Sequence, residues 1–442
     1  MGSLMNFFEE HIRFEILTVI WLLYLWELYL SLRQRKLMKN LAAIPSSLDG
    51  LMSADVYEKA RLYALDRNGC SNIHDLYTTI INTVLILAFA FHYYWKWGIM
   101  LIEAVGLSGD NEILTSAACL VVITTVSFLI DFPFKVYNVF VTEERHGFNK
   151  QTLSFFLRDQ LLKFLVSQLI APPLLCGFIW IVKNGGDFFF YFVWLFVVVV
   201  TLFMSVIYPE FIAPLFDKYS PLPEGELKTK IEALAASLGF PLYKLYIVEG
   251  SKRSSHSNAY LYGFYKNKRI VLFDTLVKGY CKNKSDDSKE YGCEVDEVLA
   301  ILAHELGHWK YSHTIKGLML AQISFIMNFI PFAKLINYAP MYTAFGFTSS
   351  QPIFIGLIIV TMYILTPLNT LFGVLMTVNS RRFEFQADEF GKKLGHAAAL
   401  KRALVKLQKD NLAYPLFDKL YSGWYHSHPP LLERLEALDK VD

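Results

Sequence analysis

The sequence predicts a mainly helical, polytopic membrane protein with seven transmembrane helices and a polar α+β domain. Hydrophobic residues make up 54% of the 442 residues and aromatic residues 16%, more than in an ordinary soluble protein. Long apolar runs recur along the chain, and two polar stretches, 209–314 and 377–442, interrupt or follow them. The formal net charge of +2 argues against a nucleic-acid partner. Five cysteines without a CxxC pair indicate reduced thiols and no disulfide framework.

The first apolar run, Phe14–Leu32, is long enough to span a membrane. No small-residue cleavage site follows it, so we do not interpret it as a cleavable signal peptide. The basic residues Arg33, Arg35, Lys36 and Lys39 come directly after it. By the positive-inside rule they stay in the cytoplasm, which places the N-terminus in the lumen.

Six more candidate spans follow, and the odd total of seven returns the C-terminus to the cytoplasmic side. The spans divide the chain into a membrane part at 1–208, a first polar part at 209–314, a membrane hairpin at 315–376 and a second polar part at 377–442. The six spans are Tyr77–Trp95, Ile113–Phe132, Leu161–Val182, Phe188–Tyr208, Gly317–Phe332 and Ile353–Met376.

The first polar part has the patterns of a small α+β unit. GELKTKIEALAASLGF predicts an amphipathic helix, KLYIVEG a strand, and SKRSSHSNAYLYGF with KNKRIVLFDTLV a hairpin. An extended peptide can add to an exposed edge strand through main-chain hydrogen bonds. Asn258 and Ala259, at the start of the hairpin, are the candidates for such a substrate-binding edge, and a purely structural hairpin is the alternative. His146, alone in FVTEERHGFNKQT, is interpreted as structural.

The stretch LAHELGHW predicts a metal site on a helix. His304 and His308 are four residues apart and therefore share one helix face, where both imidazoles can reach one ion. Glu305 is rotated by about 100° from His304, beside the metal and not on it. A general base for a zinc-bound water has to be there. This part of the sequence therefore predicts two ligands and a base.

The residue types alone do not decide which residue is the third metal ligand. His313 does not fit the astacin-like spacing, because that pattern needs glycine and histidine where this chain has Tyr311 and Thr314. His426 and His428 in WYHSHPP are candidates by type.

The other candidate is Glu384 in SRRFEFQADEF, as in thermolysin-like sites. Asp388 follows one turn later on the same face and could accept a hydrogen bond from a ligand imidazole. A solvated charged helix is the alternative for this segment. The predicted topology favours Glu384, because both ends of the last membrane hairpin lie on the cytoplasmic side and return it to the side of His304 and His308.

Four motifs together resemble the type I CAAX prenyl endoprotease family: LAHELGHWKYSH, SKRSSHSNAYLYGFYKNKRIVLFDTL, RRFEFQADEFGKKLG and WYHSHPPLLERLEAL. The resemblance implies seven tilted helices around a large chamber, capped by a gluzincin-type zinc domain on the cytoplasmic or nucleoplasmic side. It implies one Zn²⁺ per chain and the following site residues: ligands His304, His308 and Glu384, the base Glu305, and Asn258, His428 and Arg434 in contact with the substrate or the transition state.

The resemblance also implies the activity. The family removes the C-terminal aaX tripeptide from farnesylated CAAX proteins, such as a-factor and prelamin A, and a second upstream cleavage stays open. The implied location is the endoplasmic reticulum membrane, with the inner nuclear membrane as a second address. Prenylated substrates and membrane lipid are the expected partners, and a monomer is the expected state.

Three other functions remain as alternatives. An intramembrane metalloprotease would carry HExxH inside an apolar span, whereas here VDEVLAILA precedes the motif and WKYSHTIK follows it. A membrane quality-control zinc protease would share the site chemistry. A transporter or scaffold with structural zinc would have no use for Glu305, because structural zinc sites are closed.

Overall fold

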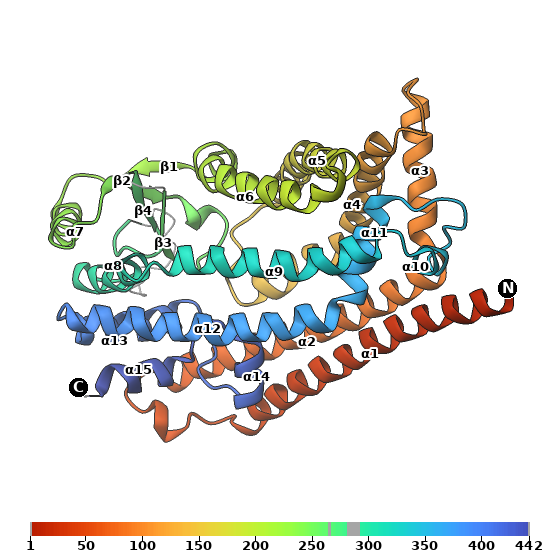
Figure 1. Ribbon diagram of the computed structural model, residues 1–442. Coiled ribbons are helices and arrows are strands. Elements are labelled where there is room, and N and C mark those ends of the chain that lie inside the picture. The colour runs from red at the N-terminus through yellow and green to blue at the C-terminus, as the bar shows by residue number, and fades with distance from the viewer. Residues whose placement is uncertain (1, 264–266, 281–291, 441–442) are drawn as a thin grey trace.

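A computed structural model describes residues 2–263, 267–280 and 292–440 of the chain. The molecule is elongated and mainly helical, and a small sheet lies at the end opposite to α3 (Figure 1). Five helices are long and apolar enough to cross a membrane, and two bent helix pairs raise the number of candidate spans to seven. The five are His11–Asn40, Glu112–Glu143, Leu153–Asn184, Gly186–Leu215 and His313–Leu335. The mainly helical membrane fold that we predicted is confirmed.

Two of the predicted spans are bent and not straight. A break inside Tyr77–Trp95 separates α2 (Ala54–Leu87) from α3 (Ala90–Ala104), and the two helices meet at 71°. Phe89 at this break has a φ of 53°, in the left-handed region that ends a helix. The predicted span is therefore present as a bent pair of helices. Hydropathy identifies the apolar segment but does not show the backbone conformation of a single residue within it.

The second bent pair is the last predicted span. The helical stretch Ile353–Ile364 meets α12 (Thr366–Lys393) at 62°. Pro367 lies in the first turn of α12, where its missing N–H leaves no hydrogen bond unmade. α12 then continues far beyond the apolar sequence, so that its last turns lie beside α8 (Figure 1).

The sheet has four strands in the order β1-β2-β4-β3. The strands are β1 (Tyr219–Pro221), β2 (Leu242–Val248), β3 (Ala259–Tyr262) and β4 (Lys268–Phe273). β3 and β4 form the predicted antiparallel hairpin, with Ala259 opposite Leu272, and β2 pairs with β4 in parallel. β3 is therefore an edge strand, as the candidate role of Asn258 and Ala259 requires. We did not predict the short strand β1.

One face of the sheet forms a core with α7 (Glu226–Ser237) and α8 (Val295–Lys310). Ile231 of α7, Ile270 of β4 and Leu302 of α8 are all at most 1% exposed in this core. α8 begins with a capping box, in which the side chains of Glu294 and Glu297 satisfy each other's backbone N–H groups. The helix that carries the HExxH motif is thus fixed at its start and buried along its length.

α12 approaches α8 closely at Gly307. A Cβ atom at this position would lie only 3.0 Å from the Cα atom of Ala387. The glycine inside HELGH is therefore needed so that α12 can bring its side chains to the histidines. The remaining helices are α1 (Gly2–Asn40), α4 (Glu112–Tyr137), α5 (Leu153–Asn184), α6 (Phe189–Ile207), α9 (His313–Leu335), α10 (Ala339–Thr343), α11 (Ile353–Ile358), α13 (Ala397–Asp410), α14 (Lys419–Tyr425) and α15 (Leu431–Asp439).

The described cysteines form no disulfide. Cys70, Cys119, Cys176 and Cys293 are free thiols, in agreement with the predicted absence of a disulfide framework in the described part of the chain. Cys281 lies outside the described residues.

Candidate metal centre

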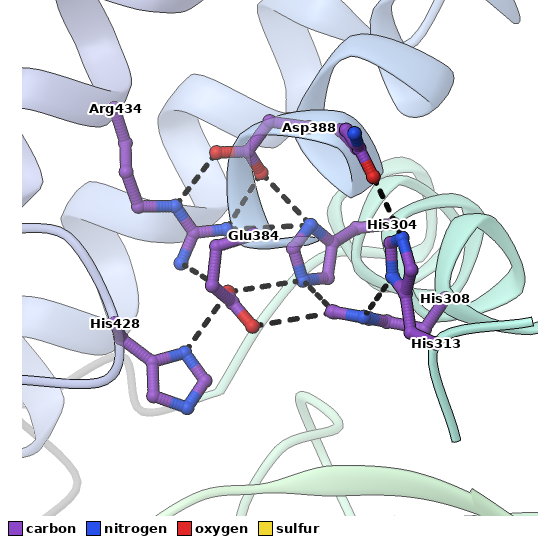
Figure 2. A network of polar contacts seen from close by, with 8 residues as sticks. His304, His308, His313, Glu384, Asp388, His428 and Arg434 are labelled. Carbon is purple, nitrogen blue, oxygen red and sulfur yellow. Dashed lines mark hydrogen bonds and ion pairs between the residues drawn. The ribbon is translucent and has the colours of Figure 1, made fainter. Parts of the chain in front are cut away.

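Two helices supply the three predicted metal ligands. His304 and His308 lie on α8 and Glu384 lies on α12, and one ligand atom from each falls within 4.8 Å of the others. The Nε2 atoms of the two histidines are 3.2 Å apart. The carboxylate oxygens of Glu384 lie 3.3 Å from Nε2 of His308 and 3.5 Å from Nε2 of His304. Figure 2 shows these atoms converging on one point.

These spacings fit a metal ion. Zinc–nitrogen bonds of about 2.0–2.1 Å in a tetrahedron place neighbouring ligand atoms roughly 3.3 Å apart. Glu384 is 3% exposed, and the side chains within 4 Å of its Oε2 atom are the basic groups of His304, His428 and Arg434. A buried carboxylate is costly unless positive charge faces it, and a bound metal ion would supply more of that charge. Within the described residues this is the one group of three or more such side chains that could hold an ion.

His304 is held by a charged pair. Its Nδ1 atom donates to Oδ1 of Asp388 at 2.8 Å, as predicted from the position of Asp388 one turn after Glu384. The guanidinium of Arg434 binds both oxygens of Asp388, at 2.8 and 2.6 Å. Burial by itself would lower the pKa of His304, but its bonds to Asp388 and Glu384 raise it to about 9. A metal ion therefore has to displace a proton from this site.

His308 is held by a neutral chain that we did not foresee. With its Nε2 lone pair facing the ligand cluster, its Nδ1–H donates to Nδ1 of His313 at 2.9 Å. Nε2–H of His313 then donates to Oε1 of Gln386 on α12, also at 2.9 Å. The ring of His313 is 5% exposed and stacks on Phe383 with centroids 4.0 Å apart. His313 is thus no ligand, in agreement with its spacing, but it orients one.

The chain reverses between the two helices to allow this contact. Ser312 has a φ of 56°, and it separates α8 from α9. On a continuous helix, residues five apart point in different directions. The left-handed residue turns His313 back toward His308. No residue pattern announces such a turn at a serine.

The three predicted catalytic residues occupy different positions. No hydrogen bond or ion pair to another described residue engages Glu305, and burial raises the pKa of its carboxyl above the usual value. The exposed ring of His428 lies with Nδ1 2.9 Å from Oε2 of Glu384. Arg434 is mostly committed to Asp388, but its Nη1 atom lies 3.7 Å from Glu384 (Figure 2). His426 packs against Phe417 instead, with ring centroids 4.2 Å apart, so the structure does not bring it into the ligand group.

Ala259 begins the edge strand β3, which packs against α8, and Asn258 directly precedes the strand. The side chain of Ala259 is buried in the core under the sheet, so a peptide could use only its backbone. The segment before β3 is braced from the membrane part. The ring of His256 stacks on Phe148 at 4.2 Å, and Asn149 forms a β-bridge with Ser254.

The neighbouring His146 is structural, as expected. Its Nε2 atom lies 2.9 Å from the carboxylate of Asp66, and its ring lies 4.9 Å from that of Tyr63. Both partners belong to α2, so His146 fastens the loop to this helix and not to the metal group.

Two family models cover almost the whole chain. Residues 34–218 match the model described as CAAX prenyl protease N-terminal, five membrane helices, and residues 221–442 match Peptidase family M48. The CAAX prenyl protease 1 homologs of Mus musculus and Homo sapiens are each 46% identical to this chain, over 97% of it and 96% of the relative. The Arabidopsis thaliana homolog is 43% identical over 95% and 96%. The crystal structure of S. mikatae Ste24p matches with a TM-score of 0.87 at 35% identity, over 97% of this chain and 99% of that one.

Proposed function

This chain is a multi-pass membrane metalloprotease that belongs to the CAAX prenyl proteases of peptidase family M48, and from that premise we propose that it removes the aaX tripeptide from farnesylated CAAX proteins. The observation that carries the proposal is the His304–His308–Glu384 group with the unpaired Glu305 beside it. A structural metal site has no need of such a carboxylate.

We assign zinc as the metal, because two imidazoles and one carboxylate at these spacings are the donors of hydrolytic zinc sites. When bound, the ion supplies Lewis acidity and lowers the pKa of a bound water toward neutrality. Glu305 takes the proton of the attacking water and delivers it to the leaving amine. Burial raises the pKa of Glu305 above that of an exposed glutamate, which makes its carboxylate a better proton acceptor.

His428 and Arg434 are assigned to the oxyanion that forms on the scissile carbonyl. Both lie beside Glu384, at 2.9 Å for Nδ1 of His428 and 3.7 Å for Nη1 of Arg434 (Figure 2). The free edge of β3, from Ala259 onward, would hold the substrate extended. Asn258 would position the start of this edge, because its carbonyl oxygen accepts a hydrogen bond from the N–H of Phe273 and its side-chain oxygen accepts one from the N–H of Ala259. We infer a chamber between the membrane helices, whose apolar side chains would bind the farnesyl chain.

We further propose the endoplasmic reticulum as the location, with the N-terminus in the lumen and the C-terminus in the cytoplasm. The basic cluster Arg33 to Lys39 at the end of α1 supports this orientation. The metal group then faces the compartment in which prenylated C-termini are found. An endoplasmic reticulum protein can also reach the inner nuclear membrane.

The deciding experiment compares a farnesylated CAAX peptide with the same peptide left unmodified. We expect mass spectrometry to find the aaX tripeptide released from the farnesylated peptide only, and a chelator to abolish the release. Glu305→Ala should keep its zinc but lose at least about a hundredfold in rate, because general-base catalysis contributes that much. Glu389→Ala, an exposed glutamate of α12, is the matched control. Near-normal cleavage by Glu305→Ala would remove Glu305 as the base, and equal cleavage of both peptides would contradict the prenyl specificity.

A further inference from the structure

A pocket that contains none of the metal-group residues lies at the end of α1 that carries the basic cluster. Its volume is about 520 Å³, within the range of small-ligand sites. α1, α2 and the end of α4 form its walls. Arg35, Gly69, Ile73 and Phe134 are among the lining residues. None of them takes part in the proposed reaction.

The pocket opens on the outer side of α2. Asp66, Gly69 and Ile73 line it and recur at a spacing of three and four residues, which puts them on one face of the helix. Arg67 and Asp75 lie on another face of α2, and their charges act on Tyr421 of α14. The face of α2 that lines the pocket is therefore different from the face that points toward α14.

An exposed apolar stripe continues from the pocket along the same helix. Its residues follow helical spacing and are between 39% and 65% exposed: Ile73, Leu76, Ile80, Val84 and Leu87. In a membrane-spanning helix such a stripe faces lipid. The pocket thus lies where a lipid-facing surface reaches the predicted cytoplasmic interface.

Arg35 gives the pocket a positive charge that the described residues do not compensate. Its Nη1 atom donates to the carbonyl oxygen of Leu65 at 2.9 Å and to Oδ1 of Asn68 at 3.2 Å, both neutral. No described carboxylate forms an ion pair with it. Arg145, the other arginine of the pocket, differs because Asp66 binds it at 2.9 Å. One guanidinium therefore keeps donors for an anion.

Gly69 lies directly beside this guanidinium. A Cβ atom there would be in ordinary contact with Nη1 of Arg35 at 3.4 Å, so a side chain as large as leucine would compete with the guanidinium for space. The glycine therefore offers a way to disturb the pocket without removing its charge.

We propose that this pocket binds an anionic phospholipid. A guanidinium with free donors matches a phosphate group, and the acyl chains would lie on the stripe from Ile73 to Leu87. The stripe favours a lipid over free phosphate, because a soluble anion gains nothing from an apolar surface that continues away from the charge.

The test uses the purified full-length protein in detergent, with phosphatidylserine, phosphatidylcholine or inorganic phosphate added, and native mass spectrometry to count bound molecules. We expect phosphatidylserine to be retained over phosphatidylcholine, and Arg35→Gln to weaken that retention roughly tenfold, the scale of a lost charge-assisted contact. Lys36→Gln is the matched control, since Lys36 is an exposed cation one residue further that does not line the pocket.

Gly69→Leu keeps the charge and should weaken retention as Arg35→Gln does, which provides a second variant if the first does not fold. An equal loss with Lys36→Gln would overturn the proposal in favour of general surface attraction. Inorganic phosphate that displaces the lipid completely at millimolar concentration would overturn it in favour of a plain anion site. Equal retention of both lipids by the wild type would overturn it outright.

Discussion

The two ligand histidines of this chain are supported in opposite ways. Nδ1 of His304 faces the carboxylate of Asp388, which Arg434 neutralises, and all three side chains are nearly buried. Nδ1 of His308 faces the neutral ring of His313, and that ring faces an exposed amide, Gln386. Both supports end on α12, the helix that also supplies Glu384 (Figure 2).

The difference concerns the charge around the metal. A carboxylate behind an imidazole makes that ligand a stronger donor, and here Arg434 cancels its charge. A second carboxylate behind His308 would add a negative charge with no cation to balance it. The metal would then be a weaker Lewis acid. The neutral support orients His308 without this cost, because it places no further anion behind the ligands.

The largest effect is expected at Glu384, the metal ligand on the same helix that carries the ends of both supports. Glu384→Ala should bring the zinc content of the purified protein to background and abolish peptide cleavage, since only two imidazoles remain. The loss in affinity should exceed about a hundredfold, the upper end for residues behind the ligands. Metal analysis after dialysis measures it, with Glu389→Ala as control. A Glu384→Ala protein with one zinc per chain would remove this residue from the site.

Breaking the charged support comes next. Asp388→Asn keeps an oxygen for His304 but leaves Arg434 buried without its counter-ion. We expect zinc affinity to fall about 10- to 100-fold and the free energy of unfolding to fall by about 3–5 kcal/mol. Competition with a chromophoric chelator gives the affinity, and thermal unfolding in detergent gives the stability.

The double variant Asp388→Asn/Arg434→Met separates these two losses. Removing the unpaired guanidinium should return most of the stability while zinc affinity stays low. Cleavage is not the readout here, because Arg434 is also assigned to the oxyanion. Full recovery of zinc affinity in the double variant would mean that the unpaired guanidinium of Arg434, and not the loss of the Asp388 carboxylate, weakened zinc binding.

The sequence predicts part of the charged support of His304 and none of the neutral support of His308. Asp388 could be predicted because it lies one turn from Glu384 on a helix, and helical spacing is visible in a sequence. His313 and Gln386 could not, because their contact depends on the left-handed Ser312 between two helices. Arg434 was identified by resemblance alone, since 46 residues separate it from Asp388.

The fold shows the same limit. The amphipathic helix α7 and the hairpin β3–β4 follow from local patterns, and the structure contains both. The bend at Phe89 comes from one left-handed backbone angle within an apolar segment. The hydropathy of that segment is uniformly high and gives no sign of the bend. Hydropathy therefore predicts which segments are apolar and long enough to cross a membrane, and it does not predict where a segment turns.

Breaking the neutral support should have a smaller effect than breaking the charged one. His313→Phe keeps the ring that stacks on Phe383 but removes the acceptor of His308. We expect zinc affinity to fall about tenfold, the low end for such positions, with little change in thermal stability. His313→Asn is the matched control, because its side-chain oxygen can take the place of Nδ1. A loss in both variants would point to packing and not to the hydrogen bond.

The smallest effect is expected at the end of the neutral chain. Gln386 is exposed, so in Gln386→Leu a water molecule can accept the hydrogen bond from His313, and zinc affinity should change less than about threefold. Gln386→Glu is more informative, because it gives His308 the kind of support that His304 has. If the neutral support keeps the metal acidic, this variant should bind zinc more tightly and cleave the farnesylated peptide more slowly. Tighter binding with unchanged cleavage would show that charge behind His308 is tolerated, and the contrast between the two histidines would then be one of orientation alone.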